Sequence, residues 1–361
     1  MLKLGILVGG RSGEHEVSVM SAKSVFEAVD KNKYDPLLIG ISKEGCWYLI
    51  EDPESVFSRG FVGPDAGLPV TIIPQPQGQP FVALDGSNVP GLDVVFPVLH
   101  GTFGEDGTVQ GLLDLAGIPY VGAGVMASAV GMDKIMMKRL FRHAGLPVVN
   151  DISLTRRFFR ESREEAIKFI EEHIPYPCFV KPANLGSSVG VSKADSREEL
   201  DRALDEAARY DFKIIVEQGV PAREIECSVL GNDAPECSIP GEIIPGRDFY
   251  DYEAKYKDDR SQLLIPAPLT EEQVRQVKDL AVRAFRAIDC AGLARVDFFV
   301  TKDTGKIFVN EINTMPGFTT ISMYPKLWEA SGLPYDRLIS RLIELALEKH
   351  KEKSENETTY S

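Results

Sequence analysis

The chain has 361 residues and a mass of 39.8 kDa, more than one typical domain, so two or three sub-domains with room for a cleft are expected. Hydrophobic residues make up 43% and charged residues 26%, which excludes a disordered, collagen-like or disulfide-scaffold protein. The 54 acidic residues outnumber the 40 basic ones and give a net charge of −14, which argues against a nucleic-acid or membrane-surface partner.

The cysteines and the apolar segments predict a soluble protein of the cytoplasm. The five cysteines are odd in number and form no CxxC pair, so reduced thiols are expected and a zinc site is not. No segment approaches the roughly 18 continuous apolar residues of a membrane-spanning helix. Residues 1–8 lack a following cleavage site, so they predict a buried strand rather than a signal peptide.

The first third of the chain has an α/β pattern. After the strand at 1–8, a glycine-rich turn at 9–13 leads into a helix whose apolar stripe is Val17, Met20, Val25 and Val29. Strands are predicted at 34–41 and at 92–99, the latter apolar enough to be covered on both faces. Residues 51–91 are rich in Pro and Gly and predict an insertion or a meander of short elements.

The middle of the chain predicts an α+β unit. A helix at 127–143 ends at a Gly-Leu-Pro stop signal, after which a second lobe is expected to begin. This lobe is predicted to contain a helix at 163–173, a strand at 177–181, a Gly/Ser loop, a helix at 197–209 and a strand at 213–218.

The last third predicts further strands and two long helices. A loop rich in aromatic and charged residues occupies 246–266, and a helix follows at 271–287. A hairpin at 293–313 and a helix at 334–349 complete the pattern, with a frayed polar tail at 351–361.

The hairpin carries the strongest chemical signal. With a three-residue turn at 303–305, Lys302 is placed opposite Lys306, which sets Asp297 opposite Glu311 and Arg295 opposite Asn313 on one face. The same register places Phe299 and Val309 on that face. Paired carboxylates repel unless a cation lies between them, and such oxygen ligands suit Mg²⁺ bound with phosphates. A solvated hairpin face is the alternative.

A lysine at a strand end precedes a flexible loop. Lys181 is followed by Gly186-Ser187-Ser188-Val189-Gly190, whose backbone N–H groups could hold a phosphate, although the sequence is not a P-loop. An ordinary turn is the alternative. Lys134 and Lys138 share one helix face and could equally be surface charge.

Other catalytic patterns are weak. Residues 9–13 do not have the dinucleotide-binding spacing, and residues 122–127 fit G-x-G-x-x-A but have no acidic residue about twenty positions later. His100 ends the apolar strand at 92–99, where α/β proteins place ligand crevices, but a structural histidine is an even alternative. No GxSxG elbow is present.

Taken in chain order, these and further motifs closely resemble the D-alanine–D-alanine ligase family of ATP-grasp enzymes. The motifs are Gly9-Gly10-x-Ser12-x-Glu14-x-Glu16-Val17-Ser18, His100-Gly101-x-x-Gly104-Glu105-Asp106-Gly107, Met132-Asp133-Lys134, Lys181-Pro182 with 186–190, Phe249 to Tyr256, Arg295-Val296-Asp297, and Asn310 to Gly317. The resemblance covers residues 1–349. It implies a three-lobed ATP-grasp fold: an N-terminal α/β substrate domain at 1–122, a central lobe at 123–216, and a C-terminal lobe at 217–361 with the metal site and a closing loop at 246–266.

The resemblance also implies a reaction. ATP phosphorylates the carboxylate of one D-alanine, and the amine of a second attacks the acyl phosphate to give D-alanyl-D-alanine for peptidoglycan synthesis. The implied cofactors are ATP as co-substrate and two Mg²⁺ or Mn²⁺ ions, with a monovalent cation as a further candidate. The implied partners are D-alanine and a second copy of the chain in a homodimer.

Site residues follow from the matched motifs. The catalytic set is Glu14, Ser187, Tyr256, Arg295, Gly317 and Ser322. The substrate-binding set is Glu14, His100 and Ser322, and the metal set is Asp297, Glu311 and Asn313. The ATP-binding set is Lys134, Lys181, Ser187, Glu217, Gln218, Val220, Glu224, Phe249 and Lys255. A Glu14-Ser187-Tyr256 link is expected to hold the loop at 246–266 shut.

Specificity and activity leave alternatives. Family members that make D-alanyl-D-lactate tend to carry Phe at the position of Tyr256, or a differently built loop, so Glu253-Ala254-Lys255-Tyr256 favours the dipeptide product. D-alanine–D-lactate and D-alanine–D-serine ligases are the alternatives within the fold. A nucleotide-binding regulator without catalysis is the alternative from another class.

Overall fold

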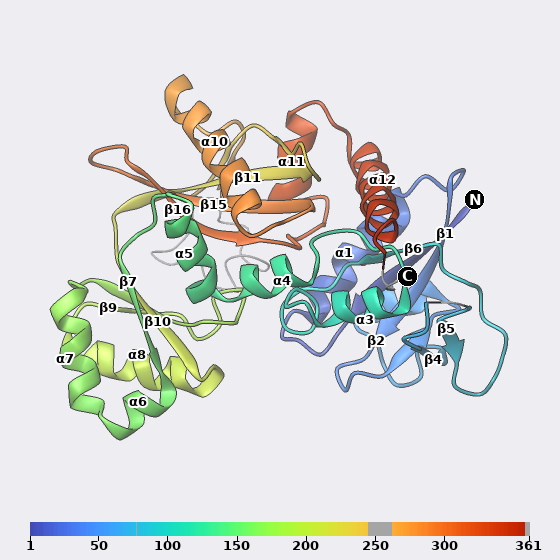
Figure 1. Ribbon diagram of the computed structural model, residues 1–361, viewed down its shortest axis with the longest axis horizontal. Helices are drawn as coiled ribbons and strands as arrows, with labels where there is room; N and C mark the ends of the chain where they lie inside the picture. The colour runs from blue at the N-terminus through green and yellow to red at the C-terminus, as the bar shows by residue number, and fades with distance from the viewer. Residues whose placement is uncertain (77, 245–261, 358–361) are drawn as a thin grey trace.

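Three β-sheets organise the chain. The computed structural model describes residues 1–76, 78–244 and 262–357. In Figure 1 the blue N-terminal sheet and the green-to-yellow second sheet lie at opposite ends of the long axis, and the yellow-to-orange third sheet lies above and between them. In the described part of the chain, no helix is long and apolar enough to cross a membrane.

The N-terminal sheet confirms the predicted α/β pattern. Its strand order is β5-β4-β3-β2-β1-β6, and β1 (Leu2–Gly9) runs parallel to both β2 (Tyr34–Ile41) and β6 (Val94–Pro97). The region at 51–91 is a meander, as expected. It contains α2 (Pro53–Arg59), β4 (Leu68–Ile72) and β5 (Phe81–Ala83), and β3 (Trp47–Leu49) comes just before it.

Both faces of this sheet are covered. Leu4, Ile6 and Val8 point to α1 (His15–Ala28), whereas Leu7 on the opposite face packs with α3 (Thr108–Ala116). The prediction that Met20 belongs to the buried apolar stripe of α1 is wrong, because Met20 is 47% exposed on the outer face of the helix.

The second sheet has the order β7-β10-β8-β9. Its strands are β7 (Asp151–Thr155), β8 (Cys178–Pro182), β9 (Ser192–Ala194) and β10 (Lys213–Gln218), and its helices are α6 (Arg156–Glu161), α7 (Arg163–His173) and α8 (Arg197–Tyr210). The apolar positions of α7 and α8 pack on one sheet face in a core of their own.

The third sheet carries one buried and one polar face. Its order is β14-β13-β11-β15-β16, with β12 paired to β11. The strands are β11 (Ala222–Gly231), β12 (Glu236–Cys237), β13 (Gly241–Ile244), β14 (Gln262–Leu264), β15 (Gly292–Thr301) and β16 (Ile307–Asn313). The buried face packs against α10 (Glu271–Ala287), which a Thr270–Gln273 capping box begins.

Two predicted helices differ from the structure. The single helix at 127–143 is wrong, because the chain breaks at Asp133 into α4 (Val125–Met132) and α5 (Lys134–His143). The Asp133 carboxylate accepts hydrogen bonds from the N–H groups of Ile135 and Met136 and so caps α5. The predicted frayed tail is also wrong up to Ser354, where α12 (Tyr335–Ser354) ends.

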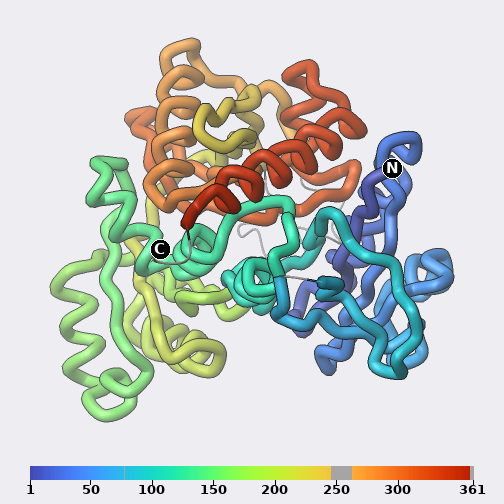
Figure 2. The backbone as a smooth tube through the Cα atoms, turned by 45° about the vertical axis from the view of Figure 1, so that its right-hand side comes forward, coloured from blue at the N-terminus to red at the C-terminus, as the bar shows by residue number. Residues whose placement is uncertain are grey.

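Of the two C-terminal helices, α12 packs against the N-terminal part of the chain. The sequence did not predict the other C-terminal helix, α11 (Met323–Ala330). The apolar face of α12 packs on the N-terminal sheet beside α1. In Figure 2 the red α12 runs across the molecule between the orange chain above it and the cyan chain below it. Helices α4 and α5 pack into the core of the third sheet.

Candidate active site

The polar face of the third sheet carries a row of acidic residues. The register confirms Asp297 opposite Glu311 and Arg295 opposite Asn313 on β15 and β16. On the other side of β15, Glu226 of β11 lies opposite Asp297. Three carboxylates from three adjacent strands therefore lie side by side, and the sequence analysis did not identify Glu226.

A β-bulge makes this register possible. Between the turn and Phe298, each residue of β15 pairs one position away from its predicted partner on β16. The register shifts between Asp297 and Phe298. Because the bulge reverses the side-chain alternation, Val309 is fully buried in the apolar core. The prediction that Val309 shares the polar face is therefore wrong.

Arg295 holds this row together. Its Nε and Nη2 donate to Asp297 Oδ1 and Oδ2, both at 2.7 Å, and Nε lies 3.1 Å from Glu226 Oε2. Burial opposes the charge, but Asp297 and Glu226 outweigh it and hold the pKa of Arg295 well above its usual range. The guanidinium therefore supplies part of the positive charge that adjacent carboxylates require.

The donor set of this face fits a hard divalent cation. Asp297, Glu311 and Asn313 offer carboxylate and amide oxygens, and Asn313 Nδ2 donates to Asp297 Oδ2 at 3.2 Å. Each carboxylate oxygen has two lone pairs, so the Arg295 fork leaves acceptor capacity on Asp297. Among the described residues no group of three or more His, Cys, Asp or Glu side chains forms a self-sufficient metal site.

A buried ion cluster lies in the second sheet. Glu217 on β10 is 2% exposed; its Oε2 accepts from Lys181 Nζ at 2.7 Å and its Oε1 lies 2.8 Å from Lys138 Nζ. Burial raises the pKa of Glu217, but Lys138 and Lys181 outweigh that effect and lower it to about 2. The interpretation of Lys138 as surface charge is wrong, because this side chain is 1% exposed.

Lys181 connects the cluster to the acidic row. Burial opposes its charge, whereas Glu217 and then Glu311 raise the pKa of its ammonium group. The charge of a lysine on the second sheet is therefore favoured by a carboxylate on the third.

The Gly/Ser loop lies over the N-terminal sheet. Lys134 Nζ donates to Leu185 O at 2.6 Å, and Ser187 and Ser188 adopt left-handed φ angles of 50° and 58°. The Ser187 hydroxyl donates to Glu14 Oε1. Ser187 and Glu14, which are 173 positions apart in the sequence, are thus in contact where the N-terminal and central parts of the chain face each other.

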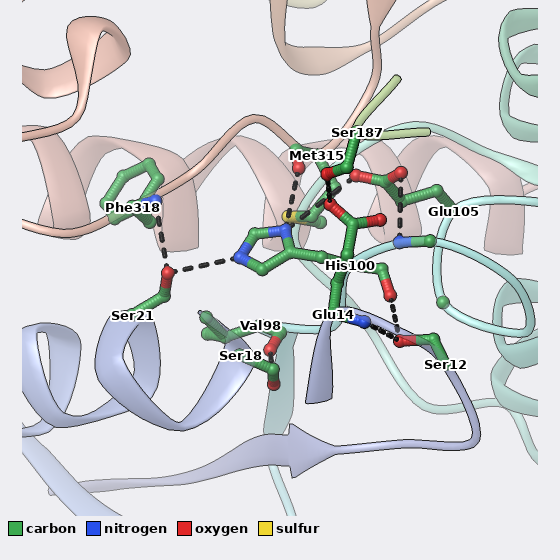
Figure 3. A network of polar contacts seen from close by, with 12 residues as sticks. Ser12, Glu14, Ser18, Ser21, Val98, His100, Glu105, Ser187, Met315 and Phe318 are labelled. Carbon is green, nitrogen blue, oxygen red and sulfur yellow. Dashed lines mark hydrogen bonds and ion pairs between the residues drawn. The ribbon is translucent and has the colours of Figure 1, made fainter. Parts of the chain in front are cut away.

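His100 occupies the carboxyl end of the N-terminal sheet, as Figure 3 shows. Its Nδ1 lies 3.1 Å from Met315 O and 3.8 Å from Glu105 Oε1. Burial opposes protonation, but Glu105 raises the pKa of His100 above its usual value. A Cβ built on Gly101, whose φ is +76°, would lie only 2.7 Å from Glu14 Oε2, so glycine leaves room for that carboxylate.

The remaining sequence-predicted residues fall in three places. Gln218, Val220 and Glu224 lie where β10 leads into β11, and Asn150 donates to Gln218 Oε1 at 3.2 Å. Gly317 and Ser322 are neighbours, since a Cβ on Gly317 would lie 3.1 Å from Ser322 Oγ. Phe249, Lys255 and Tyr256 lie outside the described residues.

Comparison with known proteins identifies the family. Residues 3–123 match the family model for the D-ala D-ala ligase N-terminus, and residues 140–344 match that for the D-ala D-ala ligase C-terminus. The chain is 52% identical over 361 residues to a D-alanine–D-alanine ligase of Natranaerobius thermophilus, covering 100% of this chain and 99% of the relative. A D-alanine–D-alanine ligase of Heliobacterium modesticaldum is 49% identical, with 98% and 97% covered.

Solved structures agree with the sequence relatives. The D-alanine-D-alanine ligase of Coxiella burnetii matches with a TM-score of 0.83 at 41% identity, covering 98% of this chain and 97% of that one. The VanG D-Ala:D-Ser ligase of Enterococcus faecalis matches with a TM-score of 0.86 at 37% identity, covering 96% and 99%. The chain belongs to the D-alanine–D-alanine ligase family.

Proposed function

We propose that this protein uses ATP to join two D-alanine molecules into D-alanyl-D-alanine for peptidoglycan synthesis. The observation that carries the proposal is the polar face of the third sheet, where Asp297 lies opposite Glu311, Arg295 lies opposite Asn313, and the Arg295 guanidinium donates to both Asp297 oxygens. Such a combination of a positive group and oxygen ligands is what phosphoryl transfer from ATP to a carboxylate requires.

The first D-alanine would lie between the N-terminal sheet and the Gly/Ser loop. Glu14 would accept its ammonium group, with His100 beside it, and Ser187 orients the Glu14 carboxylate through its hydrogen bond. The substrate carboxylate then points toward the third sheet, where its oxygen attacks the γ-phosphorus and ADP leaves.

Charge on the phosphates is offset by residues of two sheets. Lys134 and Lys181 would contact the phosphates from the central part of the chain, and Arg295 would do so from β15. Asp297, Glu311 and Asn313 would hold two Mg²⁺ or Mn²⁺ ions, which polarise the phosphoryl oxygens when bound. Glu217 keeps Lys181 charged and pointed at this site. Glu217, Gln218, Val220, Glu224 and Phe249 would lie near the adenine and ribose, and Lys255 would join Lys134 and Lys181 at the phosphates.

The second half-reaction uses the segment after β16. Ser322 would bind the carboxylate of the second D-alanine, whose amine attacks the acyl carbon. Arg295 and the Gly317 N–H would stabilise the oxyanion of the tetrahedral intermediate until phosphate leaves. A proton must leave the amine before attack, and a chain through Ser187 and Tyr256 is the proposed route.

Further parts of the proposal concern the whole molecule. The lobes at 1–122, 123–216 and 217–361 would enclose the site, and the loop at 246–266 would exclude the water that hydrolyses acyl phosphates. We place the enzyme in the cytoplasm as a homodimer, with a monovalent cation as a candidate activator. The five cysteines, all free thiols, fit a reducing compartment.

The test offers the pure protein ATP, Mg²⁺ and one acceptor at a time. D-alanine alone should give phosphate and a product with the mass of the dipeptide, and Asp297→Ala should abolish both. The D-Ala:D-Ser ligase among the structural matches makes D-serine the informative second acceptor. Faster ligation of D-alanine to D-serine or D-lactate than to D-alanine would refute the dipeptide assignment.

A further inference from the structure

We propose that Ser21 is a positioning residue for the ligation step: together with His100 it fixes the backbone from Met315 to Phe318 and so aims the Gly317 N–H at the reacting carbon. This inference rests on the proposed function, because Gly317 matters only if an oxyanion forms beside it. Ser21 belongs to none of the sets that the sequence predicted.

The contacts of Ser21 reach across the molecule. Ser21 lies on α1 with a fully buried side chain, and its Oγ is 3.1 Å from His100 Nε2. The Phe318 N–H donates to the same Oγ at 3.3 Å, across 297 residues of sequence. Figure 3 shows the His100 ring between Ser21 on one side and Met315 on the other.

The two side chains hold both ends of one short segment. His100 Nδ1 meets the carbonyl of Met315, while Ser21 meets the N–H of Phe318, and Gly317 lies between these points. In either charge state of the imidazole, Nδ1–H donates to Met315 O. Ser21 Oγ can donate to Nε2 or accept from it while it also accepts from Phe318, so the clamp is complete in both states.

The surrounding core anchors the side chain of Phe318 but leaves its N–H to Ser21. The ring is fully buried and packs edge-on against Phe96, with centroids 5.5 Å apart, and Tyr335 donates to the Phe318 carbonyl at 2.5 Å. Removing the Ser21 hydroxyl would take from that buried N–H the acceptor it has in the structure, and the segment would shift to solvate it. A shift of about 1 Å at a catalytic donor can cost about 100-fold in rate.

Ser18 provides a matched control on the same helix. It too is fully buried, and its Oγ accepts from the Gly9 N–H at 2.8 Å and donates to Val98 O. These contacts stay within the N-terminal sheet and do not touch Met315 to Phe318. Ser18→Ala and Ser21→Ala therefore each remove one buried hydroxyl, but only Ser21→Ala releases the segment that carries Gly317.

The experiment compares steady-state kinetics and melting temperatures of wild type, Ser21→Ala, Ser21→Cys and Ser18→Ala. We expect Ser21→Ala to lower kcat about tenfold or more, with KM for ATP and for each D-alanine within about threefold, because an oxyanion donor acts in the transition state. Ser21→Cys, which keeps a weak hydrogen-bonding group, should fall between wild type and Ser21→Ala. Ser18→Ala should lose melting temperature but keep kcat within about twofold.

Three results would overturn the inference. They are equal kcat for Ser21→Ala and Ser18→Ala, a raised KM for D-alanine with unchanged kcat, and a Ser21→Cys variant slower than Ser21→Ala. If Ser21→Ala does not fold, the comparison of Ser21→Cys with Ser18→Ala decides by the same criterion. A wild-type protein that releases no phosphate with D-alanine would instead refute the proposed function itself.

Discussion

The buried ion cluster gives the most quantitative prediction, for the variant Glu217→Gln. This change removes the carboxylate that lies between Lys138 and Lys181 and keeps the side-chain volume. Lys138 is 1% exposed, so its ammonium group would remain buried without its counter-charge. Breaking a buried ion pair by removing one partner costs about 3–5 kcal/mol of folding free energy.

The lowered pKa of Glu217, which reflects the same two lysines, corresponds to a similar magnitude. Its fall from 4.5 to about 2 corresponds to about 3 kcal/mol of stability at roughly 1.36 kcal/mol for each pH unit. Because the folded-state pKa is lowered, this contribution is complete above about pH 5 and is lost as the pH falls toward 2. The difference between wild type and Glu217→Gln should therefore shrink by about 1 kcal/mol between pH 7 and pH 3.5.

The assay is urea unfolding of wild type, Glu217→Gln and a control, Glu161→Gln, at pH 7, 5, 4 and 3.5. Glu161 pairs with Arg157 at an exposed position, so its loss should cost less than about 0.5 kcal/mol at every pH. A loss below about 1 kcal/mol for Glu217→Gln at pH 7, or a loss independent of pH, would refute the reasoning.

Three further predictions concern the reaction. Asp297→Asn should lower kcat about 100-fold or more, since it weakens both the cation ligand and the Arg295 fork, and Mg²⁺ titration of the rate should show a weaker apparent affinity. Ser187→Ala should raise KM for the first D-alanine about tenfold, because Glu14 loses a charge-assisted hydrogen bond, whereas an unchanged KM in saturation kinetics would contradict this role. Tyr256→Phe should change the pH-rate profile and improve D-lactate as acceptor relative to D-alanine; identical profiles and acceptor ratios would disprove the proton route and the specificity argument together.

The sequence predicted Asp297 and Glu311, two of the three carboxylates in the acidic row, because hairpin geometry is local. A short turn and period-two alternation were enough to place Asp297 opposite Glu311. The bulge between Asp297 and Phe298 was not predictable, because no glycine or proline marks it, and so Val309 was assigned to the wrong face. The predicted register was right at the site and one residue out near the turn.

Contacts between distant segments were beyond pattern reasoning. The sequence left Lys138 open as a surface charge and did not single out Glu226. Only the packing of α5 and β11 against other elements makes them buried partners of Glu217 and Arg295. The break at Asp133 was visible in principle, since Asp caps helices well, but the continuous apolar pattern at 127–143 outweighed it.

The central claim, ligation through a D-alanyl phosphate, is tested most directly with D-alanine carrying ¹⁸O in both carboxylate oxygens. The attacking carboxylate oxygen becomes the bridge to phosphorus and leaves with phosphate when the amine attacks. Mass spectrometry should therefore find one ¹⁸O in each phosphate released, with one dipeptide formed for each phosphate. Unlabelled phosphate, or phosphate released without dipeptide, would contradict the account.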